Sequence, residues 1–469
     1  MGTCSVKEHF SGMRINSSDF PEVISLSSLY KTTDFYFYKS EKVNIFKAIE
    51  YNTDFPVIIK SISLNSESDL VFNEIHLLKS LDHPNIISLR RYFKTSQNYY
   101  LVYRDDNAQS VIDFFEKKVV PVTQQEIKNL FKQILRTVNY LHSKGVIHCN
   151  LSFHSLFYSN DKQLSIGGFS NTINLKFTHK ANNDLVPCKS TLSIGFQAPE
   201  VLKGMCNTKS DIWTIGVVFH SLLTASLPFH SQDKDTMIKT ILNDELNPEL
   251  LKKQIVNDSL VELILAMLTK DYKKRPSAAE LLEFKFLKES AKDNSKSIYL
   301  HSFENIKKFA SKSAILKKLR FSLVNVVMIK TEKNAFLDSF NRIDYNKDGV
   351  ISFEELVQAK SLADIHIEKE ELLNIFNQLD QNKDGVIEFT EFVAAFVIFR
   401  KDQNKAQIRT LFNEIDSDKN GFLSFEELES FLGHEAEIIK ELEQLRSFMK
   451  NGISMSFEDF LKLIEAFEQ

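Results

Sequence analysis

The chain has 469 residues, of which 43% are hydrophobic and 26% charged, and its formal net charge is −4. This is the composition of a folded protein, and the length predicts about two to four domains. The balanced charge excludes a general nucleic-acid binder, because such proteins carry a large basic excess that neutralises phosphates. The longest apolar stretches, such as residues 392–399, are far shorter than the roughly 18 residues that suggest a membrane span.

Residues 1–28 are predicted to form a tail. Gly2, followed by Cys4 and Ser5, resembles a dual acylation signal with myristate on Gly2 and palmitate on Cys4, although Val6 stands where that motif has serine or threonine. Two lipids would attach the protein stably to a membrane surface. The alternative is a flexible soluble tail.

The cysteines of the chain are scattered and form no C-x-x-C pair. Such a distribution fits neither a disulfide framework nor a zinc site. We therefore expect a cytoplasmic, reducing compartment. The four cysteines are Cys4, Cys149, Cys188 and Cys206.

Residues 29–288 contain short runs that resemble the protein-kinase signature set, in the order of that family. Lys60 ends a Val-Ile-Ile-Lys run like that of the strand carrying the phosphate-binding lysine. Glu74 lies in the segment that supplies the lysine's partner, and Tyr103 stands at the gatekeeper position. The resemblance implies a bilobal α+β protein-kinase fold. Further runs match landmarks of the large lobe, with Glu200 and Arg275 as a structural ion pair: Ala198-Pro199-Glu200, residues 210–217 and Lys274-Arg275-Pro276.

The residues that carry phosphoryl transfer in this family are replaced. Transfer needs an aspartate that orients the substrate hydroxyl, and an aspartate and an asparagine that hold magnesium. In the catalytic-loop run 148–155, Asn150 replaces the aspartate that orients the hydroxyl, and Ser155 replaces the metal-binding asparagine. Further along the chain, Gly168 replaces the magnesium-binding aspartate. We therefore predict no catalytic residue, since Asn150 occupies the catalytic aspartate position.

The glycine-rich loop of the family is missing as well. Tyr38, Ser40 and Val43 stand where three glycines belong, and their side chains hinder close approach of the backbone to phosphates. Tight binding of ATP and magnesium is not expected. Lys60 and Glu74 are the residues that could still contact a nucleotide, and the alternative is a pair that only anchors a helix to the sheet.

Residues 289–330 form a basic junction. From His301 to Lys330 there are seven basic residues and one acid, and the apolar residues of the segment 303–326 recur at the three- and four-residue steps of one helix face. A surface helix docked on its own domain is the simplest interpretation. The acidic region that follows favours a second one, in which this helix is the ligand of that region.

Residues 331–469 carry 29 acidic and 15 basic residues, a net charge of −14, so the first 330 residues must carry +10 to give −4. Asp344, Asp380 and Asp416 lie 36 residues apart, and each opens the pattern D-x-[DN]-x-[DN]-G-x5-E of an EF-hand calcium loop. Isolated acidic capping turns would not repeat in register. A glycine permits the turn around the ion, and a closing glutamate supplies two of the oxygen ligands. Three Ca²⁺ sites are predicted, with these ligands: Asp344, Asn346, Asp348, Val350, Ser352, Glu355, Asp380, Asn382, Asp384, Val386, Glu388, Glu391, Asp416, Asp418, Asn420, Phe422, Ser424 and Glu427.

A fourth EF-hand unit is degenerate. Residues 456–460 resemble the end of the other loops, but Phe448, Lys450 and Gly452 occupy the early ligand positions and offer no side-chain oxygen. This unit is expected only to pair with the third. Apolar residues at position 8 are expected to join neighbouring loops through a short two-stranded ribbon.

A kinase-like domain, a basic junction and an all-α EF-hand domain in this order resemble the calcium-dependent protein kinases over almost the whole chain. In that family the junction blocks the kinase at low calcium, and the calcium-loaded EF-hands bind it and relieve the block. The resemblance and the lost chemistry predict a calcium-sensing regulatory or scaffold protein with an inactive kinase domain. Its EF-hand domain is expected to bind the junction 303–330, and its other protein partners are not identified.

Two alternative functions stay open. The first is an active calcium-regulated Ser/Thr kinase with unconventional chemistry. The second is a calcium buffer, which the basic junction disfavours because a buffer needs no target for an exposed groove.

Overall fold

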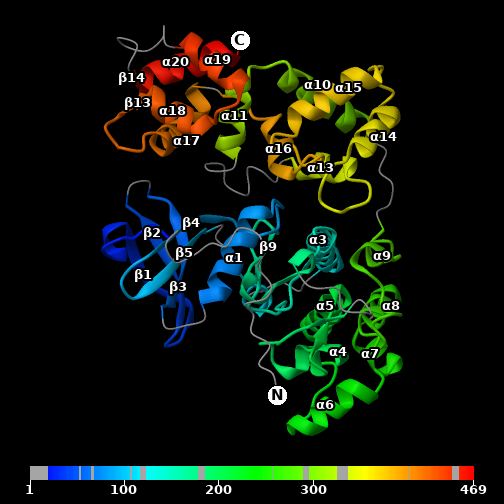
Figure 1. Cartoon of the computed structure of the whole chain (residues 1–469). Coiled ribbons are helices and arrows are strands. Elements are labelled where there is room, and N and C mark those ends of the chain that lie inside the picture. Colours follow the sequence, from blue (N-terminus) through cyan, green and yellow to red (C-terminus); the bar gives the residue numbers. More distant parts are fainter. Residues whose placement is uncertain are drawn as a thin grey trace. The chain divides into compact units, whose positions relative to one another are not determined.

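The computed structural model falls into two compact units, one built from residues up to Lys288 and one from nearly all described residues from Ser295 onward (Figure 1). Gly2 and Cys4 lie outside the described residues, so their acylation stays a prediction. The end of the junction, 325–330, and the ligand positions 448–452 of the fourth unit also lie outside. The structure describes residues 20–51, 54–64, 68–105, 108–116, 123–177, 185–255, 257–288, 295–324, 336–399, 401–445 and 454–468.

A five-stranded antiparallel sheet begins the first unit, with its strands in the order β1-β2-β3-β5-β4 (Figure 1). The inner strands β3 and β5 are rich in the β-branched and aromatic residues that favour strands, and they are almost entirely buried. Helix α1 packs against β4 and against the turn that follows the magnesium-motif position. The elements are β1 (Tyr30–Lys39), β2 (Val43–Glu50), β3 (Pro56–Ser63), α1 (Ser68–Ser80), β4 (Leu89–Lys94) and β5 (Asn98–Arg104).

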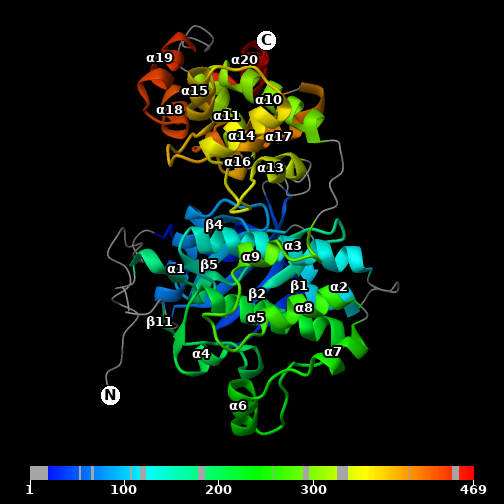
Figure 2. The same cartoon turned by 90° about the vertical axis from the view of Figure 1, so that its right-hand side faces the viewer.

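The rest of the first unit is mainly helical. Helix α3 begins with a capping box, in which Glu126 N donates to Thr123 Oγ1 and Thr123 N donates to Glu126 Oε2. Helix α5 is apolar on most of its surface and lies inside this helical part (Figure 2). The helices are α2 (Val111–Glu116), α3 (Gln124–Ser143), α4 (Pro199–Leu202), α5 (Thr208–Thr224), α6 (Lys234–Asn243), α7 (Pro248–Gln254), α8 (Asp258–Met267) and α9 (Ala278–Leu282).

Short strands and single turns join these helices. The predicted ion pair of the large lobe is confirmed, because Arg275 Nη1 lies 2.7 Å from Glu200 Oε1 and both side chains are buried. The short elements are β6 (Gln109–Ser110), β7 (Val146–Ile147), β8 (Leu156–Tyr158), β9 (Leu164–Ile166), η4 (Phe169–Asn171), β10 (Ile173–Asn174), η5 (Leu175–Phe177), β11 (Val186–Pro187), η6 (Ile194–Phe196) and β12 (Met205–Cys206), and η3 (Leu26–Ser28) precedes the sheet.

The second unit consists of helices and short ribbons between calcium loops. Ile351 and Ile387 form an antiparallel bridge, and Leu423 pairs with Met455 in the ribbon of β13 and β14. The expected pairing of the fourth EF-hand unit with the third is thereby confirmed. The elements are α13 (Leu337–Ile343), α14 (Phe353–Ala363), α15 (Lys369–Leu379), α16 (Phe389–Ala394), α17 (Lys401–Ile415), β13 (Phe422–Ser424), α18 (Phe425–Leu432), α19 (Ala436–Leu445), β14 (Ser454–Ser456) and α20 (Phe457–Glu468).

The described part of the junction forms two helices, α10 (Ser295–Ala310) and α11 (Ala314–Ser322), and not the continuous stretch that its periodicity suggests. The break has a local cause, since the Ser313 side chain accepts from Leu316 N and caps a new helix. Helix α10 packs on α13, α14 and α15, and α11 packs on α16, α18, α19 and α20 (Figure 1). The apolar junction side chains thus belong to the core of the second unit.

A helix long and apolar enough to span a membrane does not occur among the described residues.

Candidate functional site

The predicted pair of Lys60 and Glu74 comes together in the first unit. Lys60 Nζ on β3 lies 2.5 Å from Glu74 Oε2 on α1, and the two side chains are 12% and 2% exposed. The periodicity of α1 turns Glu74 toward the sheet together with Val71, Ile75 and Leu78. The pair therefore fixes the helix to the centre of the sheet.

Two further hydroxyl groups complete this network. Ser170, in the turn η4, receives a hydrogen bond from Lys60 Nζ at 2.8 Å and donates to Glu74 Oε2 at 2.6 Å. Tyr103 OH donates to Glu74 Oε1 at 2.8 Å. The backbone of η4 is tied to the same helix, because Asn73 Nδ2 donates to the carbonyl of Ser170. Sequence reasoning named Tyr103 only for its bulk and missed the role of Ser170.

The partners of Glu74 decide the charge state of this network. Burial alone would raise the pKa of Glu74, but the charge of Lys60 and the hydrogen bonds from Lys60, Ser170 and Tyr103 lower it below its ordinary value. Burial and the neighbouring carboxylate raise the pKa of Tyr103 well above the ordinary value. Glu74 is thus a carboxylate and Tyr103 a neutral donor, so Lys60 already has a paired counter-charge.

The β1–β2 hairpin stands where the family has its glycine-rich loop. Phe37 of β1 and Phe157 of β8 form an edge-to-face contact, with ring centroids 6.1 Å apart and planes at 85°. Tyr38 beside it is more than half exposed. An aromatic side chain from the hairpin thus reaches the strand that follows the catalytic-loop run.

The three positions that correspond to the catalytic and metal-binding residues lie close together. A β-carbon placed on Gly168 would lie 3.4 Å from Asn150 Nδ2 and 3.4 Å from the β-carbon of Ser155. Ser155 Oγ donates to the carbonyl of Ser152, so its hydroxyl is used by the local backbone. The arrangement therefore offers an amide, a hydroxyl and a hydrogen atom where the family's chemistry needs two carboxylates and an amide.

The scaffold of the catalytic-loop run is nevertheless held firmly. Asp211 on α5 accepts from His148 N and Cys149 N, each at 2.9 Å, and lies 2.9 Å from His142 Nε2. Burial lowers the pKa of His148, although Asp211 and the carbonyl of Gly167 oppose this. A buried carboxylate with three partners keeps the run in place without taking part in chemistry.

The three predicted calcium loops share one backbone geometry. Each has a left-handed lysine at position 4 and a left-handed glycine at position 6, for example Lys347 with φ 61° and Gly349 with φ 82°. Glycine adopts this conformation without a steric penalty. Each glycine N–H also donates to the carboxylate that opens its loop, at 2.9 to 3.0 Å: Asp344, Asp380 and Asp416.

The oxygen donors converge most closely in the third loop. Among the described residues, Asp416, Asp418 and Glu427 form the one group of acidic, histidine or cysteine side chains with ligand atoms all within 4.8 Å of one another. The closing glutamate of the second loop is more buried, and burial raises the pKa of Glu391 to about 8. All-oxygen donor sets on loops of this kind suit a hard cation such as Ca²⁺.

Comparisons with known families agree with the two-unit division. The protein kinase domain family matches residues 41–287, the EF-hand domain pair matches 333–397, and the EF hand matches 408–432. The predicted kinase fold followed by an EF-hand region is confirmed by these matches. Among solved structures, the autoinhibited serine kinase domain of the giant muscle protein titin superposes with a TM-score of 0.50 at 21% identity, covering 56% of this chain and 82% of that one.

Several curated relatives are calcium-dependent protein kinases. Calcium-dependent protein kinase 5 of Plasmodium berghei is 28% identical over 73% of this chain and 61% of its own length. Calcium-dependent protein kinase 5 of Plasmodium falciparum is 26% identical over 72% and 60%. Calcium-dependent protein kinase 29 of Arabidopsis thaliana is 28% identical over 61% and 53%. The chain thus spans about three fifths of the length of the first two relatives or slightly more than half of the third.

The network around Glu74 predicts a marked asymmetry between two conservative substitutions. Glu74→Gln keeps the side-chain shape but leaves the buried Lys60 ammonium without its counter-charge, and should lower the free energy of unfolding of the first unit by about 3–5 kcal/mol. Tyr103→Phe removes one hydrogen bond to the carboxylate and should cost about 1.5–3 kcal/mol. The measurement is chemical denaturation followed by the fluorescence of Trp213, the chain's single tryptophan.

The double variant Lys60→Met with Glu74→Gln is the control, because it removes both charges. It should be more stable than Glu74→Gln alone. Equal losses for Glu74→Gln and Tyr103→Phe would contradict an ion pair as the centre of the network.

Proposed function

We propose that this chain, which belongs to the protein kinase family and has the architecture of the calcium-dependent protein kinases, is a calcium-responsive regulatory or scaffold protein whose kinase domain does not transfer phosphate. The observation that carries the proposal is the meeting of Asn150, Ser155 and Gly168 at one place without a carboxylate. Neither a general base nor a carboxylate ligand for magnesium is available at these three positions. Loss of a general base alone typically costs about 10²–10⁴-fold in rate.

The surroundings of Lys60 support weak or absent nucleotide binding. In the family this lysine contacts the phosphates. Here the Lys60 ammonium group already donates hydrogen bonds to Glu74 and Ser170. Tyr103 also donates to Glu74, which helps to hold α1. The contact of Phe37 with Phe157 joins the hairpin to the strand that follows the catalytic-loop run. The helix is therefore held in place by protein groups alone.

The EF-hands imply calcium binding, and we further propose three ions per chain. The three loops repeat the same left-handed positions and the same hydrogen bond from glycine to the opening aspartate. Glu355, Glu391 and Glu427 would each close one loop with two oxygens. The fourth unit would contribute its ribbon and helices to the pair, without an ion.

We propose that calcium controls how the junction binds to the EF-hands. The structure supports a specific interaction, since Glu441 Oε1 and Oε2 accept from Ala314 N and Ile315 N at the start of α11. At the other end of α11, Arg320 forms a buried ion pair with Glu468. Lys312 Nζ also donates to the carbonyl of Glu468. The EF-hand region thus contacts the charged side chains and the N-terminus of α11 as well as the apolar face of the junction.

Calcium opens sensor-type EF-hand pairs and exposes the apolar groove in which such a helix lies. Because the junction is part of the same chain, its effective concentration is on the order of millimolar, and a modest intrinsic affinity suffices. A change in how the junction is held would change which partners can contact the kinase-like domain. This sensing role separates the proposal from a passive calcium buffer.

The replaced catalytic residues predict that the protein does not transfer phosphate. Purified protein with magnesium-ATP should phosphorylate neither itself nor generic protein substrates above the level of a Lys60→Met control, with phosphate incorporation as the measurement. Turnover that disappears in this control would establish the alternative, an active kinase with unconventional chemistry.

Restoring two carboxylates provides a second arm of this experiment. Asn150→Asp with Gly168→Asp should still give little activity, because the glycine-free hairpin would continue to obstruct the phosphates. Full activity in this variant would show that the hairpin does not obstruct the phosphates.

The calcium stoichiometry follows from the loops. Calorimetry should count three ions per chain, and each of Glu355→Gln, Glu391→Gln and Glu427→Gln should remove or greatly weaken one of them, because the closing ligand loses an oxygen donor. A count of four, or unchanged binding in the three variants, would show that the ligand assignment is wrong.

The junction contact predicts a charge-reversal experiment on the full chain. With calcium, Arg320→Glu should increase amide hydrogen exchange in α11 at least about tenfold, because a buried charge then faces Glu468. Combining it with Glu468→Arg should restore protection. Lys307→Glu is the matched control, since the pair of Lys307 with Glu371 is mostly exposed and contributes little. Equal protection of α11 with calcium and with a chelator would rule out a calcium switch through this helix.

A further inference from the structure

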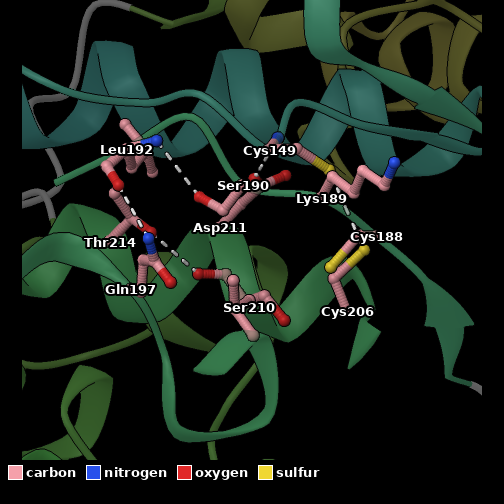
Figure 3. Close-up of a pocket in the computed structure, with 11 residues that line it drawn as sticks. Cys149, Cys188, Lys189, Ser190, Leu192, Gln197, Cys206, Ser210, Asp211 and Thr214 are labelled. Carbon is pink, nitrogen blue, oxygen red and sulfur yellow. Dashed lines mark hydrogen bonds between the residues drawn. The ribbon is translucent and has the colours of Figure 1, made fainter. Parts of the chain in front are cut away.

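Three of the chain's four cysteines converge in one pocket of the first unit (Figure 3). Cys149 belongs to the catalytic-loop run, Cys188 follows β11, and Cys206 ends β12, so three separate segments supply the thiols. Ser190, Gln197 and Thr214 also line the pocket. Scattered positions in the sequence gave no sign of this cluster.

Cys206 contacts both of the other thiols. Its Sγ lies 3.9 Å from Cys149 Sγ, and it also shares a hydrogen bond with Cys188. A disulfide bond is about 2.05 Å long, so an approach of about 2 Å would form it. The backbones are already fixed nearby: Cys149 N donates to Asp211 Oδ1 at 2.9 Å, and Cys206 pairs with Val186 across the β11–β12 ribbon.

We propose that Cys149 and Cys206 are a redox modification site, at which a hydroperoxide converts the two thiols into a reversible disulfide. The bond would join the catalytic-loop run to the strand that follows α4. Every residue between these two points, including the described part of the segment 185–206, would lie within one covalent loop. The site is independent of whether the domain transfers phosphate.

The oxidation balances in two steps. The Cys149 thiol is half-buried and Cys206 is 1% exposed, so the hydroperoxide reaches Cys149 first. The sulfur of Cys149 attacks the peroxide oxygen and becomes a sulfenic acid, and the alcohol or water leaves with the displaced oxygen. Cys206 sulfur then attacks the sulfenic sulfur, the S–S bond forms, and water is released. The two thiol sulfurs lose two electrons, which the peroxide accepts.

The electrostatic surroundings set the rate of the first step. The hydrogen bond with Cys206 lowers the pKa of Cys149, but burial and the carboxylate of Asp211 raise it by more. The contact with Cys149 and burial raise the pKa of Cys206, although the contact with Cys188 opposes this. Because the thiolate is the nucleophile, the pair stays reduced against brief exposure, and its oxidation should accelerate about tenfold per pH unit near neutrality.

The position of Cys149 gives this modification a structural consequence. The catalytic-loop motif of the family has an arginine at this position. Activation segments of kinases are ordered by pairs of arginine with a phosphorylated residue, which a thiol cannot form. A covalent link from Cys149 to Cys206 would instead tie the catalytic-loop run to β12, beyond the Ala198-Pro199-Glu200 run, without a phosphate.

The test is peptide mapping of the full chain after reduction, treatment with hydrogen peroxide, and alkylation of the remaining thiols. The expected result is one linked pair of peptides containing Cys149 and Cys206, which dithiothreitol separates again, and a rate that rises about tenfold between pH 7 and pH 8. Cys188→Ser should form the same link to the same extent. Cys149→Ser and Cys206→Ser should each lose it.

The wild-type map decides the proposal even where a variant folds poorly. Four alkylated thiols after treatment, in protein that keeps its Trp213 fluorescence, would overturn it. A linked pair of Cys188 and Cys206 in place of the proposed one would overturn it as well, as would a rate that does not change with pH.

Discussion

The buried carboxylate of Glu74 is the group on which the arrangement of the kinase-like cleft depends. It is 2% exposed and satisfied by Lys60, Ser170 and Tyr103, which come from β3, η4 and β5. A carboxylate buried without partners would be costly, so these three elements and α1 must stay together. The position of α1 is thereby fixed by protein groups, in a site where family members use the same lysine to contact phosphates.

The contacts that support the fold are kept in the first unit, whereas the residues at the catalytic positions are replaced. Asp211 still holds the backbone of the catalytic-loop run at His148 and Cys149, and Arg275 still forms its buried pair with Glu200. Removing one member of such buried groups would leave an unpaired charge, which strongly destabilises a fold. Substitutions at Asn150 and Gly168 carry no such penalty, since catalytic groups do not hold the lobes together. A kinase fold can therefore lose catalytic side chains at little cost in stability.

Sequence patterns predicted most of the fold, because signature runs, apolar periodicity and loop motifs are local. The pairs of Lys60 with Glu74 and of Glu200 with Arg275 were expected from the resemblance to the protein-kinase runs. The ribbon between the third and fourth EF-hand units was expected from the apolar residue at position 8 of the loops, and the structure shows that Met455 is the partner of Leu423. The role of Ser170 did not, since its partners lie about 100 residues away in the chain and a serine has many uses. The cysteine cluster was missed for the same reason: only the tertiary fold brings Cys149 and Cys206 together.

In the second unit, the calcium loops could be predicted from the sequence, whereas the break in the junction could not. Its calcium loops are written in short repeated patterns, whereas the break between α10 and α11 depends on a single cap at Ser313. Helix α10 packs on helices of the first EF-hand pair alone, whereas α11 packs on α16 of the first pair and on α18, α19 and α20 of the second. Lys312 and Arg320 both contact Glu468 of α20. Because α11 packs on helices of both pairs, a change in the arrangement of either pair would change the packing of the junction. The cap at Ser313 begins α11 as a separate helix, so the junction meets the EF-hands as two helices with their own axes.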